Sequence, residues 1–86
     1  MRTVANVVGV GQRMTGVSKK SGKAYDFQSI AITYCDGRIA GEAAATPMMN
    51  GPDIDAIGGI CVGDHLDIVA HEYNGKLLID AVLAKV

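Results

Sequence analysis

Three lysines and two aromatic side chains lie together in one short stretch of the sequence, "GVSKKSGKAYDF". Lys19, Lys20 and Lys23 surround a Ser-Gly pair, and Tyr25 and Phe27 follow at a spacing of two. The chain has only four aromatic residues, so half of them stand beside this cationic cluster. Cations neutralise phosphates, while aromatic rings stack on bases of any sequence. Because duplex bases are already stacked on one another, the combination indicates binding of single-stranded nucleic acid.

The charges of the chain divide between its two halves. Residues 1–38 hold six cations and two carboxylates, a net charge of +4. Residues 39–86 hold two cations and seven carboxylates, a net charge of −5. The overall charge of −1 therefore hides a basic N-terminal half whose local field can attract phosphates. Arg13 lies in this half and is a further candidate for phosphate neutralisation.

Glycine-containing turn signals divide the chain into short predicted strands with almost no helix. The predicted strands cover residues 3–10 with a continuation over 11–18 after a Gly break, then 24–35, 38–45, 65–73 and 76–86. A bulge or bend is expected at the Gly break. Ser-Gly, Asp-Gly and Asn-Gly pairs predict the tight turns between strands, and the alanines of 38–45 leave a helical turn as the alternative there. The segment 46–59, with both prolines and three glycines, predicts a loop with room for one helical turn.

Short strands with Gly breaks and tight turns favour a small barrel. We therefore predict one all-β domain over residues 1–86, a five-stranded antiparallel OB-like (oligonucleotide-binding) barrel with a protruding basic hairpin. An SH3-like barrel or an open sandwich is the alternative architecture.

The alternation of side chains in the strand 24–35 predicts which of them face the core. Ile30 and Ile32 share one face, and Tyr25 and Phe27 share the other. If the isoleucines point inward, the two rings stand outside the barrel. The alternative is a bulge near Gln28-Ser29 that turns the rings inward.

The final predicted strand is apolar on both faces, which predicts a partner subunit. Leu77 and Ile79 lie on one face, and Leu78 and Val82 on the other. The second apolar face needs a cover, and a twofold copy of the chain is the simplest one. We therefore expect a homodimer.

The sequence holds no motif that indicates catalysis or a cofactor. Residues 11–18 resemble a phosphate loop, but Val17 stands where that loop requires its lysine. His65 and His71 are six residues apart, roughly 20 Å along a strand, which is too far for one zinc ion to bridge. We therefore predict a protein without enzymatic activity, metal or cofactor.

The cysteines and the N-terminal sequence predict a cytoplasmic protein. No apolar signal-peptide core is present, and no run approaches the roughly 20 apolar residues that a membrane span needs. We expect no contact with membranes. Cys35 and Cys61 are not spaced as a redox pair, so two buried free thiols are predicted.

Three stretches of the sequence resemble the single-stranded-DNA-binding protein of filamentous bacteriophages, the gene-five or helix-destabilising family. They are "GVSKKSGKAY", "TYCDG" and "GKLLIDAVLAKV", in the order that the family has them. The resemblance is clear over about half the chain and weak in residues 1–12 and 38–63. It implies an OB-like barrel, a twofold dimer and cooperative coating of single-stranded phage DNA during replication.

The resemblance also assigns roles to individual residues. The basic residues of the family's DNA-binding hairpin match Lys19 and Lys23. Its tyrosine matches Tyr25, and its apolar residue two positions later matches Phe27. The second tyrosine of the family matches Tyr34 near the end of the strand.

Elsewhere the sequence departs from the family pattern. The family arginine before Gly-Val-Ser falls on Met14, with Arg13 beside it. The aromatic residue of the second hairpin falls on Asn74, with Tyr73 beside it. The candidate nucleic-acid-binding residues are therefore Arg13, Lys19, Lys20, Lys23, Tyr25, Phe27, Tyr34 and Tyr73. The expected ligand is single-stranded DNA, with RNA left open; the alternative is an OB-like protein–protein interaction subunit that binds no nucleic acid.

Overall fold

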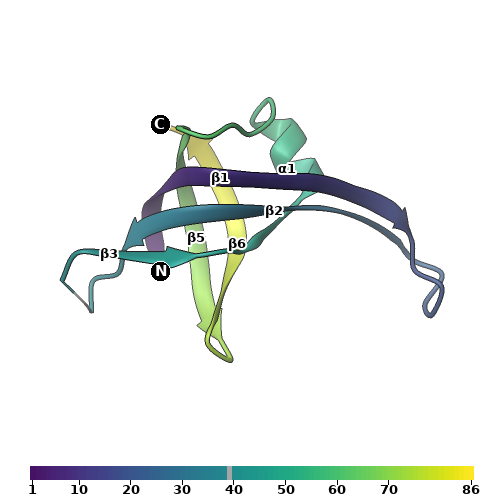
Figure 1. The fold of residues 1–86 in the computed structure, drawn as a ribbon, viewed down its shortest axis with the longest axis horizontal. Helices are drawn as coiled ribbons and strands as arrows, with labels where there is room; N and C mark the ends of the chain where they lie inside the picture. The colour runs from purple at the N-terminus through teal and green to yellow at the C-terminus, as the bar shows by residue number, and fades with distance from the viewer. Residues whose placement is uncertain (39) are drawn as a thin grey trace.

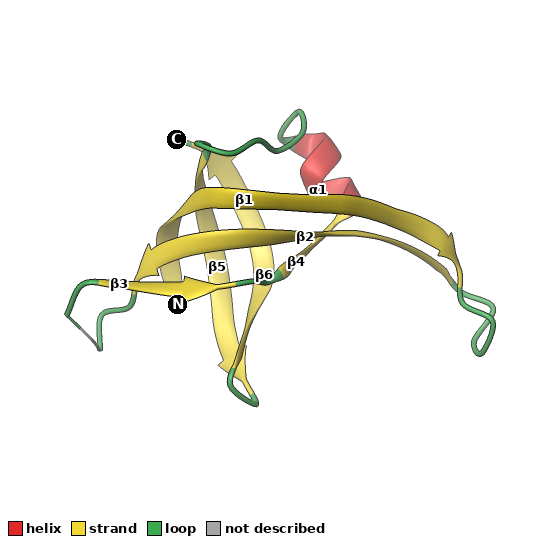
Figure 2. Ribbon diagram, in the orientation of Figure 1, coloured by secondary structure: helices red, strands yellow, loops and turns green. Residues whose placement is uncertain are grey.

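The structure, a computed structural model, describes residues 1–38 and 40–86, and Figure 1 shows that they form a curled sheet with a short helix at one end. Residue 39, inside the predicted strand 38–45, lies outside this description. The elements in chain order are β1 (Arg2–Val17), β2 (Ala24–Cys35), β3 (Glu42–Ala45), β4 (Met48–Asn50), α1 (Gly51–Ala56), β5 (His65–Tyr73) and β6 (Lys76–Lys85). The all-β class and the helical turn within 46–59 are confirmed (Figure 2). None of the described helical segments has the length and apolar character to cross a membrane.

All strand pairings are antiparallel, in the order β3-β2-β1-β5-β6, with β4 also paired to β2. The prediction of a five-stranded barrel is therefore wrong. The described residues form six strands in an open sheet, with β3 and β6 at its edges. The extra strand arises at Pro47, which has no N–H to donate and separates the four residues of β3 from the three of β4. Among the described residues, β3 and β4 pair with β2, and neither pairs with β6 to close the sheet.

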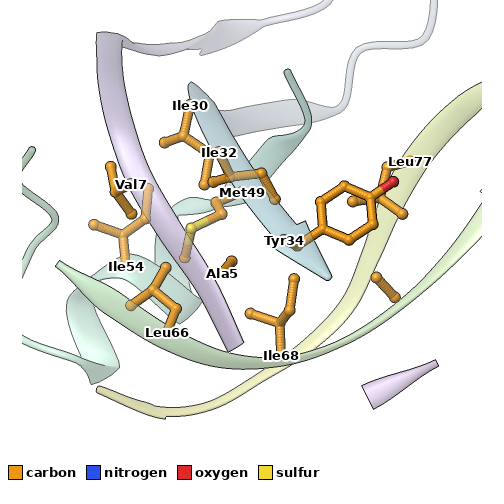
Figure 3. Close-up of a cluster of buried hydrophobic side chains, with 11 residues drawn as sticks. Ala5, Val7, Ile30, Ile32, Tyr34, Met49, Ile54, Leu66, Ile68 and Leu77 are labelled. Atoms are coloured by element: carbon orange, nitrogen blue, oxygen red, sulfur yellow. The ribbon is translucent and has the colours of Figure 1, made fainter. Parts of the chain in front are cut away.

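The core lies where β5 and β6 cross behind β1 and β2 (Figure 1). In β2 the buried residues are Ile30, Ile32 and Tyr34, at the spacing of two that the sequence predicts. Figure 3 shows these side chains converging with those of the other elements. The buried cluster comprises Ala5, Val7, Ile30, Ile32, Tyr34, Met49, Ile54, Leu66, Ile68, Ala70 and Leu77.

β1 and β2 continue beyond the core as a ribbon that projects to the right in Figure 1. At its base β4 also pairs with β2, at Phe27 and Gln28, and beyond this point the ribbon is two-stranded. We call the paired residues 13–17 and 24–28, with the turn 18–23 between them, the wing. In the turn, the N–H of Gly22 donates to the carbonyl of Ser18 (2.8 Å). Gly22 has a φ of 68°, a conformation that glycine adopts without strain. The predicted basic hairpin is therefore present and protrudes from the sheet.

The second hairpin joins β5 and β6 at Asn74 and Gly75. Both residues have positive φ, 51° and 75°, as a type I′ turn requires. Beyond Ile79, two register shifts interrupt the pairing of β5 with β6. Leu77 is buried, whereas Leu78 and Leu83 are 39% and 48% exposed. β6 therefore carries uncovered apolar side chains in the single chain.

Both cysteines are exposed free thiols, so the prediction that they are buried is wrong. Cys35 pairs with Glu42 and directly follows the buried Tyr34 along β2. Alternation therefore places its thiol on the face away from the core. Cys61 lies in the loop between α1 and β5, outside the buried cluster.

Candidate nucleic-acid interface

Tyr25 and Phe27 lie side by side on the face of the wing that points away from the core. Phe27 pairs with Met14 and Tyr25 with Gly16, and residues directly opposite in an antiparallel pair share one face. The ring centroids are 5.8 Å apart, with 41° between the ring planes. Tyr25 is 39% exposed and Phe27 is half-buried. The prediction that the two rings stand outside the core is confirmed.

The bulges in the β1–β2 pairing leave the rings on this face. The pairing shifts once between Val7 and Gly9 and once between Val10 and Arg13, and each shift adds a residue on β1. The second shift lies at the Gly break, where the sequence predicts a bulge. Because β2 itself keeps its alternation, Phe27 stays on the face opposite to the buried Ile30.

Gly16 allows the ring of Tyr25 to rest against β1. A Cβ atom at this position would lie 2.6 Å from the hydroxyl oxygen of Tyr25 and 2.8 Å from its Cζ. The ring therefore occupies the space that any other residue at position 16 would fill. A ring held in this way is a preformed surface on which a base can stack.

Two methionines that the sequence did not indicate as binding residues enlarge this apolar surface. Met14 lies opposite Phe27, and Met48 of β4 lies opposite Ser29, on the same face of β2. Both methionine side chains are exposed. Only the pairing register of the strands reveals them, since each methionine lies opposite an outward-pointing residue of β2. We call Met14, Tyr25, Phe27 and Met48 the outer wing face.

The cations that remain available are lysines rather than arginines. Outside the wing, the described residues form the ion pairs Arg2–Asp67, Arg38–Asp36, Arg38–Glu72 and Lys85–Asp64. Within the described residues, Lys19, Lys20 and Lys23 form no ion pair and are exposed at the tip of the wing. The structure therefore brings the three lysines and the two rings together on one hairpin.

Arg13 lies on the opposite side of the wing from the outer wing face. It pairs with Gln28 across the ribbon, one residue out of phase with the Met14–Phe27 pair. Its guanidinium donates hydrogen bonds to the carboxylates of Asp26 and Asp55. These bonds raise the pKa of Arg13 and hold the pKa values of both carboxyls below their usual range. The structure does not bring Arg13 to the aromatic rings.

Tyr34 lies inside the core and does not contribute to this surface. It is 4% exposed, because it follows Ile30 and Ile32 on the inner face of β2 (Figure 3). Burial raises the pKa of its hydroxyl, and the charge of Glu72 raises it further. An enclosed ring cannot stack on a base, so Tyr34 is withdrawn from the candidate binding residues.

Tyr73 is exposed but lies on a different hairpin. It is 63% exposed and pairs with Lys76 beside the Asn74-Gly75 turn. Figure 1 shows that this hairpin points away from the wing. The structure therefore places Tyr73 apart from Tyr25 and Phe27, and its role in binding stays a prediction.

The two histidines bond to different neighbours. Nδ1 of His65 lies 2.6 Å from Oδ1 of Asn6, and Nδ1 of His71 lies 2.8 Å from Oδ2 of Asp80. In the part of the chain that the structure describes, no three His, Cys, Asp or Glu residues gather as a metal site would require.

Comparison of the chain with protein-family models, with curated proteins and with solved structures gives no match. The likeness to the phage family stays a prediction made from short motifs. The wing, with two adjacent rings and three exposed lysines, is therefore the feature of the structure that bears on function.

Proposed function

We propose that this chain is a non-enzymatic protein that binds single-stranded DNA with little sequence preference, through the outer wing face and the lysines at the wing tip. The observation that carries the proposal is one protruding hairpin that joins two adjacent outward rings to three exposed lysines. We also propose that the open sheet is an OB-like fold. The proposal includes cooperative coating of phage DNA during replication in the host cytoplasm.

The chemistry of the wing favours single strands over duplexes. The lysine ammonium groups neutralise phosphates and release their counterions, whatever the base sequence. Tyr25 and Phe27 offer π-faces to bases, which only an unpaired strand can turn toward them. No arginine of the wing is free for bidentate recognition of a base edge, since Arg13 is held by two carboxylates.

The proposal is tested by fluorescence anisotropy with a labelled poly-dT oligonucleotide at low salt. We expect binding to poly-dT, weaker binding to a duplex of the same length, and competition by mixed-sequence single strands. Poly-U in the same assay measures the preference for DNA over RNA. Absence of binding to poly-dT, or equal affinity for duplex and single strand, would contradict the proposal.

The alternative function, a protein-interaction subunit, is favoured by a different feature. An open hollow of about 700 Å³ lies between the β3–β4 edge and β6, with Ala43, Ala45, Leu77 and Leu78 among its lining residues. An extended segment of a partner protein can pair with such free edges. The poly-dT assay separates the two functions, because this hollow does not include the wing lysines.

Substituting Gly16 by alanine is expected to lower affinity for poly-dT several-fold without unfolding the protein. The new methyl group displaces the ring of Tyr25, and the displaced atoms are the far end of a side chain that can rotate away. Gly37→Ala is the matched control, since a Cβ there meets no atom within 4 Å. Anisotropy and thermal unfolding of both variants check this, and a G16A protein with unchanged affinity would contradict the role of the ring position.

We also propose that the chain is a homodimer that covers the exposed apolar side chains of β6. Sedimentation velocity at micromolar concentration is expected to show a dimer. Leu78→Asp should produce monomers, because it places a charge in the covered surface. Val62→Asp, at a 65% exposed loop position, is the matched control and should stay dimeric. A monomeric wild-type protein, or equal effects of the two substitutions, would contradict this assignment.

A further inference from the structure

Arg13 joins the wing to helix α1 through two carboxylates. Its Nε and Nη2 donate to Oδ1 and Oδ2 of Asp26 in β2, at 2.8 and 2.7 Å. Its Nη1 and Nη2 donate to Oδ1 and Oδ2 of Asp55 in α1, at 2.8 and 3.2 Å. The planar guanidinium therefore holds both partners in a fixed geometry, as a bidentate fork does.

This arrangement leaves Arg13 unsuited to a phosphate. Four of its five N–H donors are already in use. One guanidinium between two carboxylates carries a net charge of −1, which repels an approaching phosphate. The side chain also lies on the face of the wing opposite to the rings.

The helix at the other end of this link is anchored in the core. Ile54, the neighbour of Asp55, is 3% exposed within the buried cluster. At the start of α1, the backbone of Gly51 packs so closely against the carboxylate of Asp26 that a Cβ atom there would collide with it. Asp26 is thus held from two sides, by Arg13 and by the helix. The Arg13–Asp26–Asp55 cluster therefore connects the base of a projecting ribbon to the body of the protein.

We propose that Arg13 is a positioning residue that locks the wing to α1 and so fixes the direction of the outer wing face, without itself neutralising a phosphate. This inference rests on the proposed function of the wing in binding single strands. In this arrangement Asp26 and Asp55 hold Arg13 in place, which gives these two acidic residues a role near the proposed nucleic-acid surface.

The first test compares Arg13→Lys with Arg13→Gln in the poly-dT assay over a range of salt. A lysine keeps the charge but cannot pair bidentately with two carboxylates, so we expect both variants to bind several-fold more weakly by similar factors. The slope of log K against log salt should stay that of the wild type. Arg2→Lys, which alters the Arg2–Asp67 pair on the sheet, is the control and should bind normally. If R13K kept wild-type affinity while R13Q flattened the slope by about 0.7, Arg13 would be a phosphate ligand and the inference overturned.

The second test uses two variants that change charge equally. Asp55→Ala frees Arg13 from α1, while its two bonds to Asp26 remain. Asp53→Ala on the same helix removes a carboxylate that forms no ion pair with the described residues. The lock predicts weaker binding by D55A than by D53A. Tighter binding by D55A than by D53A would mean that a freed Arg13 reaches the DNA, and would overturn the inference.

Amide hydrogen exchange separates positioning from a general loss of stability. In R13K and D55A, amides of the wing should exchange faster while those of the core strands keep their wild-type protection. Uniformly faster exchange, or no change in the wing, would overturn the inference. Because this readout needs no ligand, it tests the lock even if the wild-type protein fails to bind poly-dT, a result that would refute the proposed function alone.

Discussion

Replacing Lys19, Lys20 and Lys23 together by glutamine is expected to weaken binding to every single-stranded sequence. Each neutralised phosphate contributes about 0.7 to the slope of log K against log salt, so losing three flattens the slope by about 2. If the two proteins bind equally at about 1 M salt, this difference in slope makes the triple variant bind on the order of 400-fold more weakly at about 50 mM salt. Salt titrations of the wild-type and triple-variant proteins with poly-dT measure both quantities.

A charge elsewhere on the protein provides the control for this experiment. Lys85 is paired with Asp64 and is not part of the wing, so Lys85→Gln should leave the salt slope unchanged. Single substitutions of the three wing lysines should each flatten the slope by about 0.7. A triple variant with the wild-type slope would show that the wing tip is a solvated turn without a role in binding.

Replacing Tyr25 and Phe27 together by alanine is expected to remove most of the contribution of the bases to affinity. Stacking on an aromatic side chain contributes about 1–3 kcal/mol per base, so the double variant should lose roughly 2–6 kcal/mol, or roughly 30-fold to 20,000-fold. The salt slope should not change, because no cation is removed. This invariance distinguishes the double variant from the lysine variant in the same titration.

Folding stability measured on the two single variants completes the test. Tyr25→Ala should shift the free energy of unfolding by no more than about 0.5 kcal/mol, as at other exposed positions. Phe27→Ala, at a half-buried position, should cost less than the about 3–5 kcal/mol of a core phenylalanine. Tyr73 is an exposed tyrosine on the other hairpin, so the stability of Tyr73→Ala is the matched comparison for Tyr25→Ala. Unchanged affinity with a large loss of stability would mean that the rings serve the fold and not a ligand.

Local sequence patterns correctly predicted the features of the structure that depend only on neighbouring residues. The alternation around Ile30 and Ile32 placed Tyr25 and Phe27 correctly, because strand geometry fixes the side of each residue relative to the next. The Asn74-Gly75 turn was equally predictable, since few residues adopt positive φ at low cost. The same alternation puts Tyr34 on the face of Ile30 and Ile32, which is the inner face. The family resemblance assigned Tyr34 to binding, but its side chain is buried.

The partners of Arg13 could not be predicted from the sequence. Asp26 and Asp55 lie 13 and 42 positions away along the chain, and no local pattern links them to an arginine on β1. The positive charge of the N-terminal half therefore suggested a phosphate contact for Arg13, whereas the structure pairs this side chain with two carboxylates. The open sheet was missed for a similar reason, because the order in which distant strands pair is not set by neighbouring residues.

The central position of β1 in the sheet has a consequence for the time course of folding. The β1–β2 and β5–β6 hairpins each close a short turn, and such hairpins form in about 1–10 μs. Joining them requires β1 to pair with β5, as in the Arg2–Asp67 contact across 65 positions of the chain. Closure of such a long loop is slow, and sheets with distant pairings fold in about milliseconds to seconds. We therefore expect refolding to be limited by the pairing of β1 with β5, which joins the two hairpins.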